Sequence, residues 1–144
     1  MPDHVNQAQI FLPVLVVVAL TFVAFVRMGA ARSAAIKAGH DPAYYRAHIG
    51  KPEPEATVAA VRHWGNLFEL PTLFYAACLT AFVLDAVSGW ALAFAWAFVV
   101  GRVIQSAVHM SYNNPLHRGS GFVLAVAAAL GLWISIAIAV FERI

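Results

Sequence analysis

Two ionisable residues interrupt long apolar runs of the chain, at places where a charge is costly. Glu69 lies within the run 66–86, and Arg102 lies within the run 90–109. A charged side chain at the centre of a membrane span costs roughly 2.5–3.5 kcal/mol on an insertion scale. Such residues are usually paired or line a polar cavity. We therefore expect Glu69 to pair with Arg102 deep in a helical bundle, either as a clamp between helices or as part of a ligand site.

Polar neighbours extend each of these residues into a stripe. At about 100° per residue, Arg62, Asn66 and Glu69 share one face of a helix. The same spacing groups Arg102 with Gln105 and His109 on a later helix. A cavity is expected where the stripes meet, lined by Arg62, Asn66, Gln105, His109 and Arg118. Converging hydrogen-bond donors of this kind suit an anionic, polar ligand, and the surrounding apolar spans would admit a lipophilic second ligand.

Composition predicts the elements that must position these residues. The chain has 144 residues, of which 62% are hydrophobic and 11% are charged. Since a soluble domain carries about 25% charged residues, the composition excludes a disordered chain, a nucleic-acid binder and an ordinary soluble enzyme. We predict one all-α membrane domain, residues 1–144, folded as a four-helix transmembrane bundle. Its spans are expected at about 10–27, 66–86, 90–109 and 122–141, with a polar loop over about 28–62.

Loop charges predict the orientation. The side with the long loop carries seven Lys and Arg residues, and the side with both termini carries only Arg143. Lys and Arg accumulate in cytoplasmic loops. We therefore expect both termini outside and the polar cavity facing the cytoplasm. The Ala-rich composition suggests a bacterial inner membrane.

The remaining His and Cys residues indicate no metal site. His40, His48 and His63 are expected to be solvated loop residues. His109 and His117 have no Cys or carboxylate at ligand spacing. Cys78 is the only cysteine, so any thiol chemistry would use a thiol brought by a substrate.

Two segments carry a resemblance to a known family. The run VRHWGNLFELPTLF (61–74) contains R-x-x-x-N-x-x-E followed by a proline, and the run GRVIQSAVHMSYNNPLHRGSGF (101–122) contains two arginines sixteen residues apart. Both resemble the membrane-associated proteins in eicosanoid and glutathione metabolism (MAPEG), closest in type to the microsomal glutathione transferases. The resemblance implies a homotrimer in membrane lipid, with glutathione as co-substrate between neighbouring subunits and a lipophilic small molecule as second substrate.

The resemblance also implies roles for individual residues. Arg118 matches the arginine that stabilises the glutathione thiolate, and would be catalytic. The matching glutathione-binding positions are Arg27, Arg62, Asn66, Glu69, Arg102, Gln105 and His109. The sequence does not decide whether Glu69 receives the glutathione amine or orients Arg102.

Three departures from the family pattern limit the functional prediction. Gln105, His109 and Gly65 stand where family members often carry other residues, which argues against a specialised eicosanoid synthase. We expect a glutathione-dependent membrane transferase, with peroxidase activity as an extension. The alternatives are a non-catalytic MAPEG-like scaffold and, less favoured, a small transporter built around Glu69 and Arg102.

Overall fold

The computed structural model describes residues 5–144, and this part of the chain is helical without a strand. Its elements are the 3₁₀ turn η1 (Gln7–Ile10) and helices α1 (Phe11–Lys37), α2 (Tyr44–Ala47), α3 (Glu55–Asn66), α4 (Leu70–Val83), α5 (Gly89–Met110) and α6 (Pro115–Phe141). Four stretches are long and apolar enough to cross a membrane: Gln7–Lys37, Glu55–Val83, Gly89–Met110 and Pro115–Phe141. The predicted all-α fold with four membrane helices is confirmed.

The helices are longer than the predicted spans at the end that carries the long loop. α1 continues ten residues past residue 27, through the Ala-rich stretch 28–37, because Ala is the best helix former. It stops in a Schellman motif: the N–H groups of Gly39 and His40 donate to the carbonyls of Ile36 and Ala35. Gly39 has φ +96°, which glycine adopts without strain. Most of the predicted loop 28–62 is therefore helical.

The second span is two helices with a break at residues 67–69. Pro71 is the second residue of α4. Proline lacks an N–H and its ring clashes with the carbonyl four residues earlier, here that of Leu67. A regular helix through this point is thereby disfavoured, and α3 ends at Asn66 while α4 begins at Leu70.

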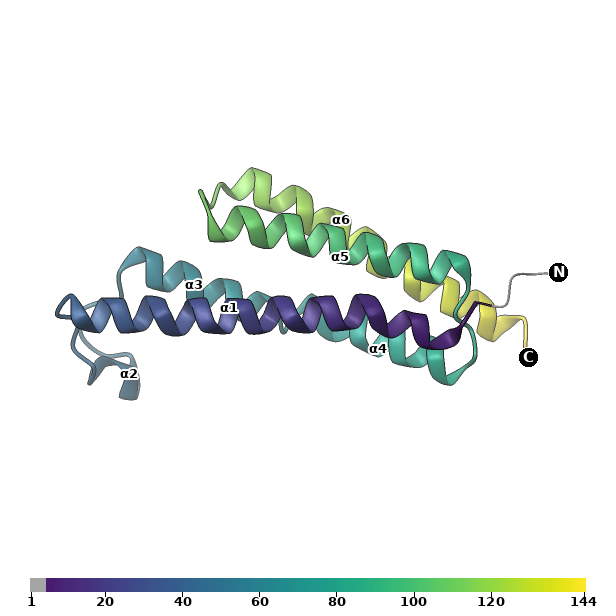
Figure 1. Cartoon of the computed structure of the whole chain (residues 1–144), viewed down its shortest axis with the longest axis horizontal. Helices are drawn as coiled ribbons and strands as arrows, with labels where there is room; N and C mark the ends of the chain where they lie inside the picture. Colours follow the sequence, from purple (N-terminus) through teal and green to yellow (C-terminus); the bar gives the residue numbers. More distant parts are fainter. Residues whose placement is uncertain (1–4) are drawn as a thin grey trace.

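Helices α5 and α6 form the most tightly packed pair. A Cβ on Gly121 would lie 2.7 Å from backbone atoms of Gln105 and Gly101, and a Cβ on Gly101 would meet α6 backbone equally closely. Figure 1 shows this pair side by side, with α1, α3 and α4 beside it. The two groups are joined through the core, where the rings of Phe74 and Phe98 stack with centroids 4.1 Å apart.

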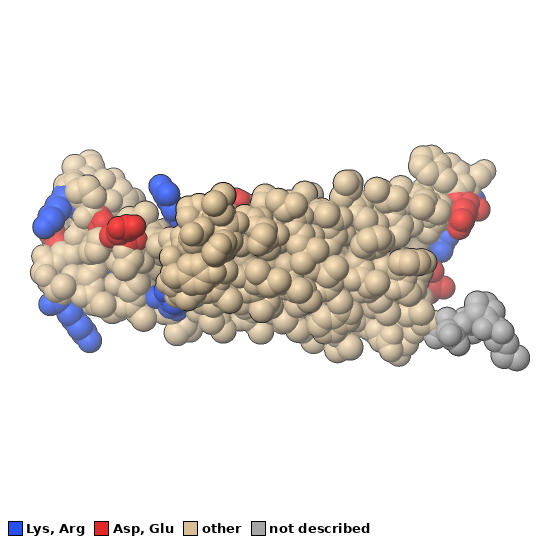
Figure 2. Space-filling view, turned by 90° about the horizontal axis from the view of Figure 1, so that it is seen from above, with Lys and Arg blue, Asp and Glu red and all other residues tan. Residues whose placement is uncertain are grey.

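The two ends of the bundle differ in charge. The start of α1, the end of α6 and the α4–α5 turn lie at one end, and the 38–54 loop and the α5–α6 turn lie at the other, called the loop end here (Figure 1). Figure 2 shows Lys and Arg side chains gathered toward the loop end, while the middle of this face is almost free of charge. Arg32 connects α1 to the 38–54 loop. Its Nε lies 3.6 Å from Glu53 Oε1, and its guanidinium lies over the ring of Tyr45.

Candidate functional site

Two adjoining polar cavities lie toward the loop end, between α3, α5 and α6. One has a volume of about 210 Å³ and the other about 270 Å³. Both are lined by Asn66 and Arg118, so they form neighbouring parts of one site. The first also contacts Arg62 and His109, and the second also contacts Gln105. These are the five residues that the sequence analysis expected around one cavity.

Arg118 is positioned by the start of α6. The Asn114 side chain caps the helix by accepting from the N–H groups of residues 116 and 117, and Pro115 occupies the first helical position, which suits its fixed φ. Arg118 therefore lies on the first turn. Its Nη1 donates to Asn113 Oδ1 at 2.9 Å and lies 3.4 Å from His109 Nε2. Two acceptors thus hold the guanidinium at the cavity wall.

Arg102 lies behind the cavities and holds two of their lining residues. Its side chain is only 2% exposed. Nη1 donates to Gln105 Oε1 at 2.6 Å, and Nη2 donates to the Asn66 carbonyl at 2.8 Å. The break before Pro71 leaves that carbonyl without its helical partner, because the N–H of Leu70 is not bonded to it. Arg102 therefore compensates for the helix break and fixes Asn66 and Gln105.

The expected ion pair between Glu69 and Arg102 is not formed. Within residues 5–144 the single ion pair shorter than 4.0 Å joins Arg32 to Glu53. Glu69 follows the end of α3, so it leaves the face that it was expected to share with Asn66, and its side chain is exposed. Arg27 is also exposed, on α1. Neither residue lines the two cavities of the chain described here.

His63, expected in solvent, is instead buried. It is 3% exposed and packs against His109, which is 4% exposed, with ring centroids 4.8 Å apart and the planes at 68°. The expectation was wrong because His63 lies on the buried face of α3 with Thr57 and Ala60. The two imidazoles are not part of a metal cluster, since residues 5–144 hold no group of three His, Cys, Asp or Glu side chains placed for one.

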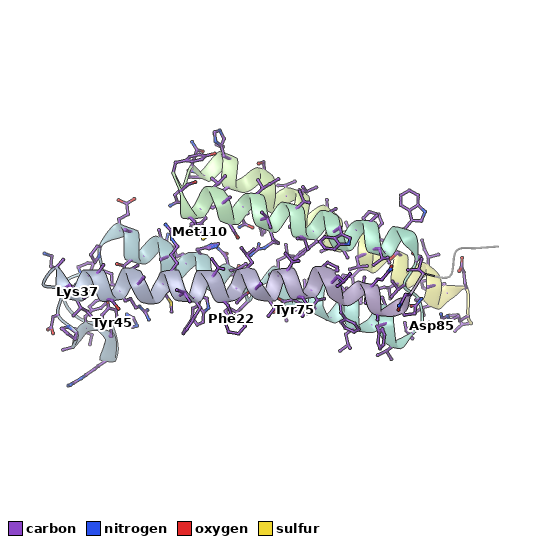
Figure 3. All side chains as sticks on the ribbon, in the orientation of Figure 1. Phe22, Lys37, Tyr45, Tyr75, Asp85 and Met110 are labelled. Carbon is purple, nitrogen blue, oxygen red and sulfur yellow. The ribbon has the colours of Figure 1, made fainter. Side chains whose placement is uncertain are left out.

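A separate apolar pocket of about 420 Å³ lies between α1 and the α3–α4 span. Its lining includes Trp64, which is two residues from both Arg62 and Asn66 and therefore points about 200° away from them around the helix. Phe22 and Tyr75 also line it, and Figure 3 places both along the middle of the bundle, away from the loop end marked by Lys37 and Tyr45. Within one chain, α3 separates this pocket from the polar cavities.

Replacing Arg102 by Met is expected to reduce the stability of the protein. The variant keeps an unbranched, flexible side chain but leaves the Asn66 carbonyl and Gln105 without their buried donor, at a cost of about 1–3 kcal/mol for each unsatisfied group. Thermal unfolding in detergent measures the loss. Arg27→Met is the control, because Arg27 is exposed. Equal unfolding midpoints for the two variants would contradict the role given to Arg102.

The chain matches one protein family over most of its length. The model of the MAPEG family matches residues 10–138, which is most of the chain and includes every cavity-lining residue named above. The chain belongs to the MAPEG family. No curated protein and no solved structure matches it. MAPEG proteins include glutathione transferases among other membrane proteins, and they generally use glutathione.

Proposed function

We propose that this protein is a glutathione-dependent integral membrane transferase that activates the glutathione thiolate for attack on lipophilic electrophiles. The observation that carries the proposal is the grouping of Arg62, Asn66, Gln105, His109 and Arg118 around two adjoining cavities at the loop end. This grouping joins three separate helices. The two arginines and two amide side chains among these residues support the binding of an anionic tripeptide.

The free hydrogen-bonding groups suit glutathione. Arg62 is exposed at the cavity, where its guanidinium would bind a carboxylate through charge-assisted hydrogen bonds. Gln105 Oε1 already accepts from Arg102, so the NH₂ group of Gln105 is left to donate to a peptide carbonyl. Arg102 holds Asn66 by its backbone carbonyl, which leaves the Asn66 side-chain amide available to the ligand.

Arg118 is the residue proposed to activate the thiol. A free thiol has a pKa near 8.5, and the thiolate is the nucleophile. An opposite charge within about 4–6 Å lowers such a pKa by about 1–3 units. The thiol proton leaves to solvent, the sulfur forms a bond to the electrophilic carbon, and the leaving group departs with the bonding electrons. In a peroxidase extension, two glutathione molecules are oxidised to the disulfide while a hydroperoxide is reduced to an alcohol and water.

Assembly as a homotrimer is part of the proposal. Glu69 is exposed in the middle of the candidate span Glu55–Val83, and a charge facing lipid there is costly. A second copy of the chain would cover Glu69 and Arg27 and bring them to a glutathione bound between subunits. With the loop end in the cytoplasm, as its Lys and Arg content favours, the site would face the cytoplasm of a bacterial cell.

Glutathione binding to the detergent-purified protein tests this function. Calorimetry is expected to give a dissociation constant at or below the millimolar range, with S-methylglutathione binding without the thiolate absorbance near 240 nm that glutathione produces. Cross-linking in the same detergent measures the trimer. Absence of binding at millimolar glutathione would overturn the transferase proposal and favour a non-catalytic scaffold.

A further inference from the structure

His63 is linked to Arg118, the proposed thiol-activating residue, through the ring of His109. Its imidazole packs edge-on against that of His109, and His109 Nε2 lies 3.4 Å from Arg118 Nη1. The three side chains come from α3, α5 and α6 in turn. His63 does not line either polar cavity. It therefore stands behind the site and can influence a ligand only through His109.

The contact with Arg118 fixes the state of His109. A guanidinium has only donors, so a hydrogen bond between the two side chains requires a lone pair on Nε2, which is the neutral tautomer of His109 with its proton on Nδ1. A flip of the ring about its long axis would remove this acceptor from Arg118. Within residues 5–144, neither His109 Nδ1 nor His63 Nε2 has a hydrogen-bond partner. Packing against His63 holds the plane of the His109 ring, and a flip within that plane would lose the contact with Arg118.

The position of the His63–His109 contact in the bundle explains why it can hold the ring of His109. α5 and α6 diverge from α1 and α3 toward the loop end (Figure 1). The His63–His109 pair joins α3 to α5 in that region, and both side chains are almost fully buried. A smaller residue at position 63 would leave a void beside His109, and voids in packed interiors relax only in part.

We propose that His63 is a positioning residue, which holds the ring of His109 so that Nε2 accepts from Arg118 and the guanidinium stays at the cavity wall. The proposal rests on the proposed function, because the group that it positions is the thiol-activating arginine. Its chemical consequence is specific: the loss of His63 weakens thiolate formation more than it weakens glutathione binding, since Arg62 and the amide side chains that bind glutathione remain in place.

Two substitutions of His63 distinguish the packing of a ring against His109 from other effects of losing the imidazole. His63→Ala is expected to lower the 240 nm thiolate absorbance and kcat about tenfold while KM for glutathione changes little; a 1 Å misplacement costs up to about 100-fold. His63→Phe keeps an aromatic ring against His109 and is expected to retain most of the wild-type signal. Trp64→Phe is the matched control, because Trp64 is the next residue of α3 and lines the separate apolar pocket instead of contacting His109.

A second readout does not depend on glutathione. Phenylglyoxal modifies accessible arginines, and mass spectrometry gives the rate at Arg118 relative to Arg62 in the same molecule. His63→Ala is expected to raise this ratio, and Trp64→Phe is expected to leave it unchanged. If the protein does not bind glutathione but His63→Ala still raises the ratio of modification at Arg118 to that at Arg62, the positioning role of His63 is supported and only the proposed function is wrong. An unchanged ratio and unchanged thiolate signal in folded His63→Ala would overturn the positioning role.

Discussion

Arg118→Ala is expected to abolish most of the thiolate formed by bound glutathione. Without the guanidinium, the pKa of the bound thiol returns toward its free value near 8.5. Because a nearby opposite charge lowers a pKa by about 1–3 units, the thiolate fraction at neutral pH should fall about tenfold or more. The measurement is the absorbance near 240 nm as a function of pH, together with kcat/KM for a lipophilic electrophile.

Two further variants show whether the effect belongs to Arg118 itself. Arg118→Lys keeps the charge but loses the planar fork, and should keep an intermediate thiolate signal. Arg62→Ala removes a proposed carboxylate contact instead, and should weaken glutathione binding while leaving the thiolate signal at saturation. If Arg118→Ala bound glutathione and still formed wild-type thiolate, the assignment of Arg118 as the activating residue would be wrong.

Gly121→Ala is expected to destabilise the α5–α6 pair strongly. The new methyl group would lie 2.7 Å from the backbone N of Gln105 and the backbone O of Gly101, and backbone atoms of two long helices cannot move aside locally. Overpacking of this kind costs about 1–3 kcal/mol. The measurement is the unfolding midpoint in detergent. Because Gln105 is displaced too, glutathione binding should weaken in parallel.

Gly119→Ala is the matched control for this substitution. Gly119 lies two residues earlier in the same helix, and a Cβ there has open space within 4 Å. Alanine is about 1 kcal/mol more favourable than glycine in a helix, so this variant should be as stable as the wild type or more stable. Equal destabilisation by the two substitutions would show that the close approach of α5 and α6 does not set the stability.

The sequence by itself determined the architecture because each span is long enough to reveal its own character. Apolar runs of about 20 residues must satisfy their backbone hydrogen bonds internally in a membrane, which leaves helices as the solution. Helical spacing also grouped Arg62 with Asn66, and Gln105 with His109, since neighbours on one helix face follow from the 3.6-residue turn. Those four residues and Arg118 do line adjoining cavities.

The tertiary structure decided which polar groups meet across helices. Glu69 and Arg102 were expected to pair because both are charged and deep, yet Arg102 binds the Asn66 carbonyl and Gln105. The reason was present in the sequence as Pro71, whose effect is local: it breaks the helix, frees a carbonyl that a buried donor must satisfy, and turns Glu69 outward.

His63 also shows which features follow from the sequence and which depend on how the helices pack. Its position three residues after Ala60, itself three after Thr57, fits a buried helix stripe, and that spacing was a usable signal. No pattern within α3 could show that the facing residue is His109 on α5, or that His109 in turn faces Arg118 on α6. Periodicity determines which face of a helix is covered, whereas the partner across that face depends on how separate helices pack.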